Sequence, residues 1–141
     1  MKSTRHEGFT LIELLIVITI IAILAGLILS AAGYAQKKGA RSRAEAEIAA
    51  VGAALESYKA DNGDYPAGTG SSVLITSLMP GSGKVYHEFK SRFTNSSGWL
   101  DPYGNTYGYI YTNGSPNNGA NNYDLWSTAG GGAPNTWIKN W

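Results

Sequence analysis

A single carboxylate, Glu13, lies at the leading edge of a long uncharged run. No charged residue occurs from Leu14 to Ala32. At about 1.5 Å rise per residue, a helix of this length reaches roughly 29 Å, the thickness of the hydrocarbon core of a bilayer. An acidic side chain carried into lipid costs roughly 2.5–3.5 kcal/mol or more unless it finds a partner. Since the run contains no Lys, Arg or His, we expect the partner of Glu13 to come from elsewhere.

The residues before the apolar run indicate which group is the partner of Glu13. A short basic leader, residues 1–8, ends at Gly8. A cut between Gly8 and Phe9 would create an α-amino group, positive at neutral pH, at the head of the same helix. A neighbouring copy could present this amine to Glu13, so that cleavage would drive self-assembly in the membrane. The alternative interpretations are a signal anchor with an incidental Glu13 and a cleaved signal peptide, whose apolar core runs only about 7–15 residues.

The stretch Gly8-Phe9-Thr10-Leu11-Ile12-Glu13 resembles the processing motif of type IV pilins and pseudopilins. The resemblance implies that a prepilin peptidase cuts after Gly8 and methylates the amine of Phe9. It also implies that Phe9, Thr10 and Glu13 act in assembly of the subunits. The segment Leu55–Pro66, in which Tyr-Lys-x-Asp-Asn leads to Tyr-Pro, is similar to the end of the long helix in the major pseudopilins of type II secretion systems.

Helical spacing continues beyond the apolar run. Apolar residues recur at steps of four and three along one stripe, formed by Ala44, Ile48, Val51, Leu55 and Tyr58. No proline occurs from Phe9 to Asp61, and Asn62-Gly63 followed by Pro66 is typical of a helix end. The sequence therefore predicts one helix from about Phe9 to Asp61, with its first half in lipid and its second half packed on a head.

Shorter elements are predicted after this helix. Ala67–Ser72 is typical of a loop, and Val73–Met79 of a short helical turn. The connecting region offers four core candidates, Val85, Tyr86, Phe89 and Phe93. Period-two patterns between turns predict strands at Tyr107–Tyr111, Tyr123–Ser127 and Thr136–Trp141. We thus expect an α+β, pilin-like fold, in which the long N-terminal helix packs against a small C-terminal antiparallel sheet.

The resemblance implies three parts: a leader at 1–8, a membrane-spanning assembly segment at 9–33 and a periplasmic head at 34–141. The function implied is that of a structural subunit polymerising into the helical pseudopilus filament of a type II secretion system. The alternative is a type IV pilin for adhesion, motility or DNA uptake. The expected partners are further copies of the chain, the prepilin peptidase, minor pseudopilins and the assembly platform of a bacterial inner membrane. Basic residues after the run, such as Lys37 and Lys38, would by themselves favour the opposite orientation.

Calcium is a further implication of the resemblance, because major pseudopilins often bind it in the loop after the second strand. Here that loop, Thr128–Asn135, holds no carboxylate, and Asp124 beside it is the one candidate ligand. Calcium takes several oxygen ligands, usually anionic ones. We expect weak calcium binding or none, although Asn, Ser and backbone oxygens could still build a site.

The residue inventory argues against an enzyme and against nucleic-acid binding. The chain has no cysteine and two histidines, His6 and His87, of which the first belongs to the leader. No Ser/His/Asp, Cys/His or zinc-ligand arrangement can be assembled from them. The formal net charge of +1 gives no electrostatic case for nucleic acid as a main partner.

Overall fold

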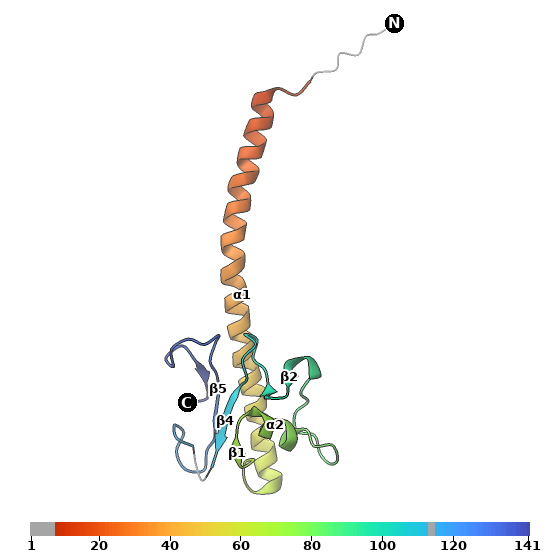
Figure 1. Ribbon diagram of the computed structural model, residues 1–141, viewed down its shortest axis with the longest axis vertical. Coiled ribbons are helices and arrows are strands. Elements are labelled where there is room, and N and C mark those ends of the chain that lie inside the picture. The colour runs from red at the N-terminus through yellow and green to blue at the C-terminus, as the bar shows by residue number, and fades with distance from the viewer. Residues whose placement is uncertain (1–7, 113–114) are drawn as a thin grey trace. The chain divides into compact units, whose positions relative to one another are not determined.

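The computed structural model describes residues 8–112 and 115–141 (Figure 1). The predicted leader, residues 1–8, therefore lies outside the described residues except for Gly8. The chain divides into two units, and the division falls between Lys38 and Gly39. One helix, α1 (Leu11–Asn62), contributes its first part to the first unit and its second part to the other.

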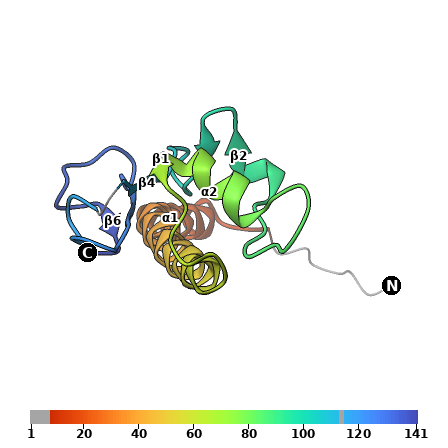
Figure 2. The same cartoon turned by 90° about the horizontal axis from the view of Figure 1, so that it is seen from below.

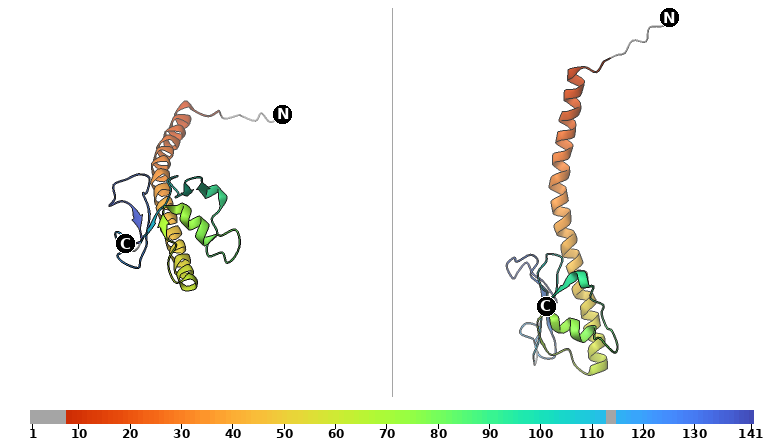
Figure 3. Two further views of the ribbon diagram at one scale, coloured as in Figure 1. Left: turned by 60° about the horizontal axis from the view of Figure 1, so that its bottom comes forward. Right: turned by 45° about the vertical axis from the view of Figure 1, so that its right-hand side comes forward.

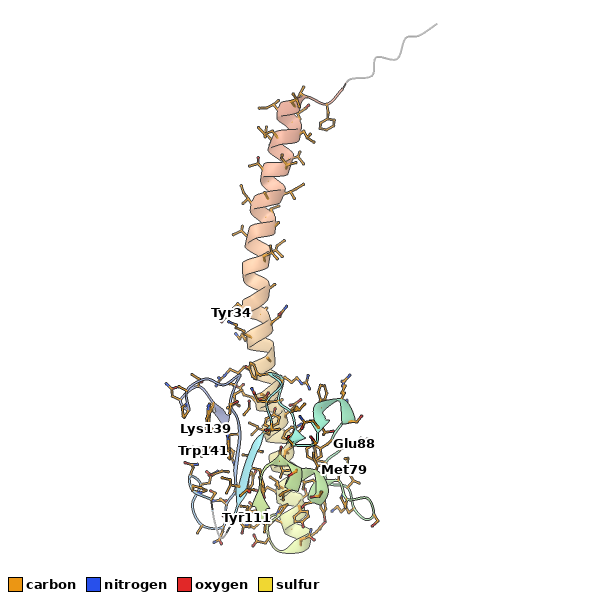
Figure 4. The ribbon with its side chains drawn as sticks, viewed as in Figure 1. Tyr34, Met79, Glu88, Tyr111, Lys139 and Trp141 are labelled. Carbon is orange, nitrogen blue, oxygen red and sulfur yellow. The ribbon has the colours of Figure 1, made fainter. Side chains whose placement is uncertain are left out.

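The first part of α1 leaves its large apolar side chains exposed. All its large apolar side chains from Leu11 to Leu29 are exposed, from 46% at Val17 to 88% at Leu11. Figure 4 shows these side chains pointing outward around the helix. Among the described residues this is the one helix long and apolar enough to cross a membrane. The structure therefore confirms that the apolar run is helical, and its membrane insertion stays a prediction.

The second part of α1 is amphipathic. Ala44, Ile48, Val51 and Leu55 are buried, as the stripe predicts, and Tyr58 is partly buried against the same core. The helix ends where Gly63 adopts φ 87° and its N–H donates to the carbonyl of Lys59 at 2.7 Å. Glycine suits this left-handed position because it has no Cβ.

A four-stranded antiparallel sheet covers one side of this part of α1 (Figure 2). Its order is β1-β4-β5-β6, formed by β1 (Gly68–Thr69), β4 (Gly108–Tyr111), β5 (Asp124–Ser127) and β6 (Ile138–Lys139). Next to the sheet, beyond its edge strand β1, lie α2 (Ser71–Leu78), the 3₁₀ turn η1 (Ser91–Phe93) and a ribbon of β2 (Thr94–Asn95) and β3 (Gly98–Trp99) (Figure 2). Two further directions of view, in Figure 3, show the same arrangement. The predicted α+β fold is thus confirmed.

Two sequence predictions in the connecting region were wrong. The stretch Ala67–Ser72 is not only a loop, because Gly68 and Thr69 pair with Tyr111 and Ile110 as an edge strand. Val85 is 52% exposed rather than part of the core. The backbone N–H groups of Tyr86 and His87 both donate to the carbonyl of Leu78 at the end of α2. Val85 lies in the turn just before these two hydrogen bonds.

Candidate functional site

The predicted processing site lies directly before α1. Gly8, Phe9 and Thr10 precede the first helical residue and are all exposed, Phe9 by 83% of its surface. A Cβ built on Gly8 would meet nothing within 4 Å. The peptide bond between Gly8 and Phe9 is therefore not covered by the described part of the chain.

Thr10 and Glu13 form a reciprocal cap on the first turn of α1. The backbone N–H of Thr10 donates to Oε2 of Glu13 at 2.9 Å, and the Thr10 hydroxyl donates to the same oxygen at 2.6 Å. In return the backbone N–H of Glu13 donates to Oγ1 of Thr10 at 3.3 Å. This is a capping box, which satisfies two N–H groups that have no partner inside the helix.

The expectation that a charged partner of Glu13 comes from elsewhere stays a prediction, and the cap adds local partners to it. Glu13 does have partners in its own chain, although Thr10 supplies only neutral donors and no cation. The spacing Thr-x-x-Glu before an apolar run is the usual signal of a capping box, so the sequence could have revealed it. Thr10 was expected to act in assembly, and the structure brings it together with Glu13 and with Phe9, its neighbour in the chain.

The calcium candidate Asp124 is committed to other contacts. Its side chain is fully buried at the start of β5. It accepts hydrogen bonds from the backbone N–H and side-chain amide of Asn117, at 3.1 and 2.7 Å, and from the N–H of Asn118 at 3.1 Å. Asp124 therefore holds the segment between β4 and β5. Among the described residues no group of three or more His, Cys, Asp or Glu side chains could hold a metal ion.

A cleft of about 460 Å³ in the head contains His87, the one histidine of the described residues. It is lined by Arg43, Glu47, His87, Glu88, Phe89, Lys90, Arg92, Phe93 and Trp99. The imidazole packs edge-on against Phe89, and burial lowers the pKa of His87 although Glu47 opposes the shift. Glu47 itself accepts from Arg43 at 2.8 Å and from the Tyr107 hydroxyl at 2.7 Å. No Ser, Thr or Cys lines this cleft, and two of its charged side chains, Arg43 and Glu47, are paired with each other.

Asp61 and Asp64, which could be imagined as an acid–base pair, serve two different contacts. Asp61 is paired with Lys84 and accepts from the Tyr86 hydroxyl, and the hydrogen bond from Lys84 is the main reason that its pKa is lowered. Asp64 accepts from the hydroxyl of Tyr111, and this hydrogen bond is likewise the main reason for its lowered pKa. Both carboxylates tie the end of α1 to the rest of the head.

Comparisons with known proteins match this chain along nearly its whole length. Residues 32–141 match the family model of type II secretion system (T2SS), protein G. The chain belongs to the type II secretion system protein G family. Residues 3–29 also match the prokaryotic N-terminal methylation motif.

Several relatives are themselves proteins of this family. The type II secretion system core protein G of Klebsiella michiganensis is 31% identical over all of this chain and 96% of its own length. The protein of the same name from Pseudomonas aeruginosa is 30% identical, over 78% of this chain and 77% of its own length. The one from Escherichia coli is 33% identical, over 76% of this chain and 74% of its own length. The predicted resemblance to the major pseudopilin is thus confirmed, and it decides against the type IV pilin alternative. The members of this family are structural subunits, the pseudopilins, and this chain is one of them.

Proposed function

We propose that this pseudopilin is made as a membrane precursor, cut between Gly8 and Phe9, methylated at the new amine and then polymerised into a helical filament. In this proposal residues 1–8 are the leader, 9–33 the membrane and assembly segment, and 34–141 the head. The filament acts as a scaffold or piston that moves folded proteins across the outer membrane, and the chain catalyses no reaction.

One observation carries the proposal: the large apolar side chains of the first part of α1, from Leu11 to Leu29, are all exposed. Lipid can cover such a surface before assembly, and the same segment of neighbouring copies can cover it afterwards. A helix whose apolar side chains are exposed in this way is suited to pass from the lipid to the filament.

The second support for the proposal is the polar group at the head of this surface. Among the described residues Glu13 is bonded only to neutral donors of Thr10. Within residues 8–112 and 115–141 no cation is paired with its charge, and a carboxylate in lipid is costly. The amine of Phe9 in a neighbouring copy supplies that counter-ion, which favours the assembled state and sets the axial register between subunits.

The membrane orientation follows from the same processing step. The peptidase that cuts the leader acts on the cytoplasmic side of the inner membrane, so the head lies in the periplasm. The basic residues Lys37, Lys38, Arg41 and Arg43 oppose this orientation in a simple charge count. Arg41 and Arg43 are each paired with a glutamate four residues on, Glu45 and Glu47, which reduces the effective positive charge on that side. The remaining partners are the minor pseudopilins and the assembly platform.

Mass spectrometry of the protein isolated from its native host tests the proposal. We expect the mature chain to begin at Phe9 with one added methyl group. The variant Gly8→Val should accumulate as full-length precursor, because a side chain at this position obstructs the bond to be cut. A chain that keeps residues 1–8 in the assembled filament would overturn the proposal.

A further inference from the structure

The loop that joins β5 to β6, residues 128–137, is tightly folded without any carboxylate. Ala129, Gly130 and Gly131 follow one another with φ of 51°, 90° and 90°. Such a run of left-handed residues is rare, and for alanine it is unfavourable, so surrounding contacts must hold it. The N–H of Gly131 donates to the carbonyl of Thr128 at 3.1 Å.

The far half of the loop is closed in a similar way. Both the N–H and the hydroxyl of Thr136 donate to the carbonyl of Ala133, at 2.8 and 2.7 Å. The carbonyl of Thr136 accepts from Arg41 of α1 at 3.1 Å. A Cβ on Gly132 would come within 2.4 Å of the Thr136 hydroxyl oxygen, which shows how closely the two halves approach.

Three tryptophans gather where this loop enters and leaves the sheet. Trp137, Lys139 and Trp141 alternate along β6 and its flanks, and therefore share one face. Lys139 pairs across the strands with Trp126 of β5, which places Trp126 diagonally between the other two rings. Figure 4 labels Lys139 and Trp141 beside the blue terminal strand.

The rings of this cluster contact one another. Trp126 lies parallel to Trp137, with centroids 6.2 Å apart and planes 6° apart, and edge-on to Trp141 at 6.0 Å. The Nζ of Lys139 is 5.0 Å from the Trp141 ring centre. Gly108, the partner of Trp126 on β4, leaves room for the indole, since a Cβ there would lie 2.0 Å from the ring.

Trp137 also binds the loop directly. Its indole N–H donates to the carbonyl of Gly132 at 2.9 Å. One side chain thus spans the loop: its ring is held by Trp126 on the sheet, and its N–H holds the middle of the loop. A stacked aromatic pair and a hydrogen bond together can replace the ordering that a bound cation gives to such a loop.

The residues present do not fit a calcium ion. The loop offers no carboxylate, and the two nearby carboxylates, Asp124 and Asp101, each already accept three hydrogen bonds from the protein. Asp124 accepts from Asn117 and Asn118. Asp101 accepts from the hydroxyl of Ser127 at 2.6 Å and from two backbone N–H groups. Calcium needs six to eight oxygens, so binding would have to break these contacts.

We propose that the cluster of Trp126, Trp137 and Trp141 closes the β5–β6 loop and makes the head independent of calcium. This proposal holds whether or not the chain polymerises, since it concerns the fold of one subunit.

The first test measures thermal unfolding of the full chain in detergent micelles, with calcium chloride or with EDTA. We expect the same unfolding midpoint in both, and no heat of binding when calcium is titrated in. A midpoint raised by calcium by more than about 4 °C, which for a domain of this size corresponds to about 1 kcal/mol, would overturn the proposal.

The second test follows amide hydrogen exchange of residues 128–136. Trp137→Ala should speed exchange of this loop by about tenfold or more, while Trp137→Phe, which keeps a ring without the indole N–H, should give a smaller increase. Phe93→Ala, which removes a ring from the other side of the head, is the matched control and should leave the loop unchanged. Unchanged exchange in Trp137→Ala, or an equal increase in the control, would contradict the proposal.

Discussion

Glu13 has two roles that can be separated at the level of one residue. In the isolated chain its carboxylate accepts from the N–H and hydroxyl of Thr10 and caps α1. In the proposed filament its charge binds the amine of Phe9 in a neighbour. Glutamine keeps a carbonyl oxygen that can accept from Thr10 but carries no charge. The substitution Glu13→Gln therefore removes the second role and largely retains the first.

We expect Glu13→Gln to be cut and methylated normally but to enter filaments poorly. Removing one partner of a buried ion pair costs about 3–5 kcal/mol, because the amine of the neighbour then lacks a counter-ion. The measurement is the ratio of sheared filament to cell-bound subunit on an immunoblot. Glu45→Gln is the control, since it makes the same chemical change at a half-exposed carboxylate outside the assembly segment. Normal assembly of Glu13→Gln would show that the carboxylate acts only as a helix cap.

At the scale of elements, burial rather than ion pairing attaches α1 to the head. Leu55 is fully buried between the helix and the sheet. The pair between Arg41 and Glu45, at 3.0 Å, is half-exposed on both sides. Pairs of this kind on a helix surface contribute only about 0.2–0.5 kcal/mol.

Leu55→Ala should lower the free energy of unfolding of the head by about 2–5 kcal/mol, because it leaves a cavity in the core. Glu45→Ala on the same helix should change it by less than about 0.5 kcal/mol. Urea unfolding of the full chain in micelles, followed by tryptophan fluorescence, measures both. A larger loss in Glu45→Ala than in Leu55→Ala would mean that charge pairs hold the helix.

At the scale of the whole molecule, the titrating groups of the head set the range of pH in which it is stable. Burial is the main reason that the pKa of His87 is lowered, from its ordinary 6.5, and hydrogen bonds lower the pKa values of Asp61 and Asp64. Below about pH 6.5 the unfolded chain therefore binds more protons than the folded head. Burial raises the pKa values of Tyr107 and Tyr109 above their ordinary 10.0. Above about pH 10 the folded head therefore retains protons that the unfolded chain loses.

These signs predict a plateau of stability between about pH 6.5 and pH 10. Stability should begin to fall below the plateau as His87 protonates in the unfolded chain, and again near the lower pKa values of the two aspartates. It should also fall above the plateau as tyrosines ionise in the unfolded chain. Thermal midpoints of the full chain, measured on the plateau and at pH values below and above it, provide the measurement. His87→Phe should remove the first acidic step alone, and a step that persists in this variant would assign it to another group.

The sequence by itself determined the parts of this protein that depend on local pattern. The uncharged run, the stripe at steps of four and three and the Asn62-Gly63 stop are sufficient to predict α1, because each acts within a few residues along the chain. The motif from Gly8 to Glu13 likewise indicated the family. The strands β4 and β5 were predicted because alternation over several residues is a strong signal.

Only the tertiary structure decided the parts that depend on distant partners. The two-residue strands β1, β2 and β3 are too short to show a period, and they exist because another strand pairs with them. The burial of Asp124 and the closure of the loop by Trp137 depend in the same way on residues brought together by the sheet. A pattern along the chain reports which face a residue occupies, whereas the partner on that face is set by how the elements pack.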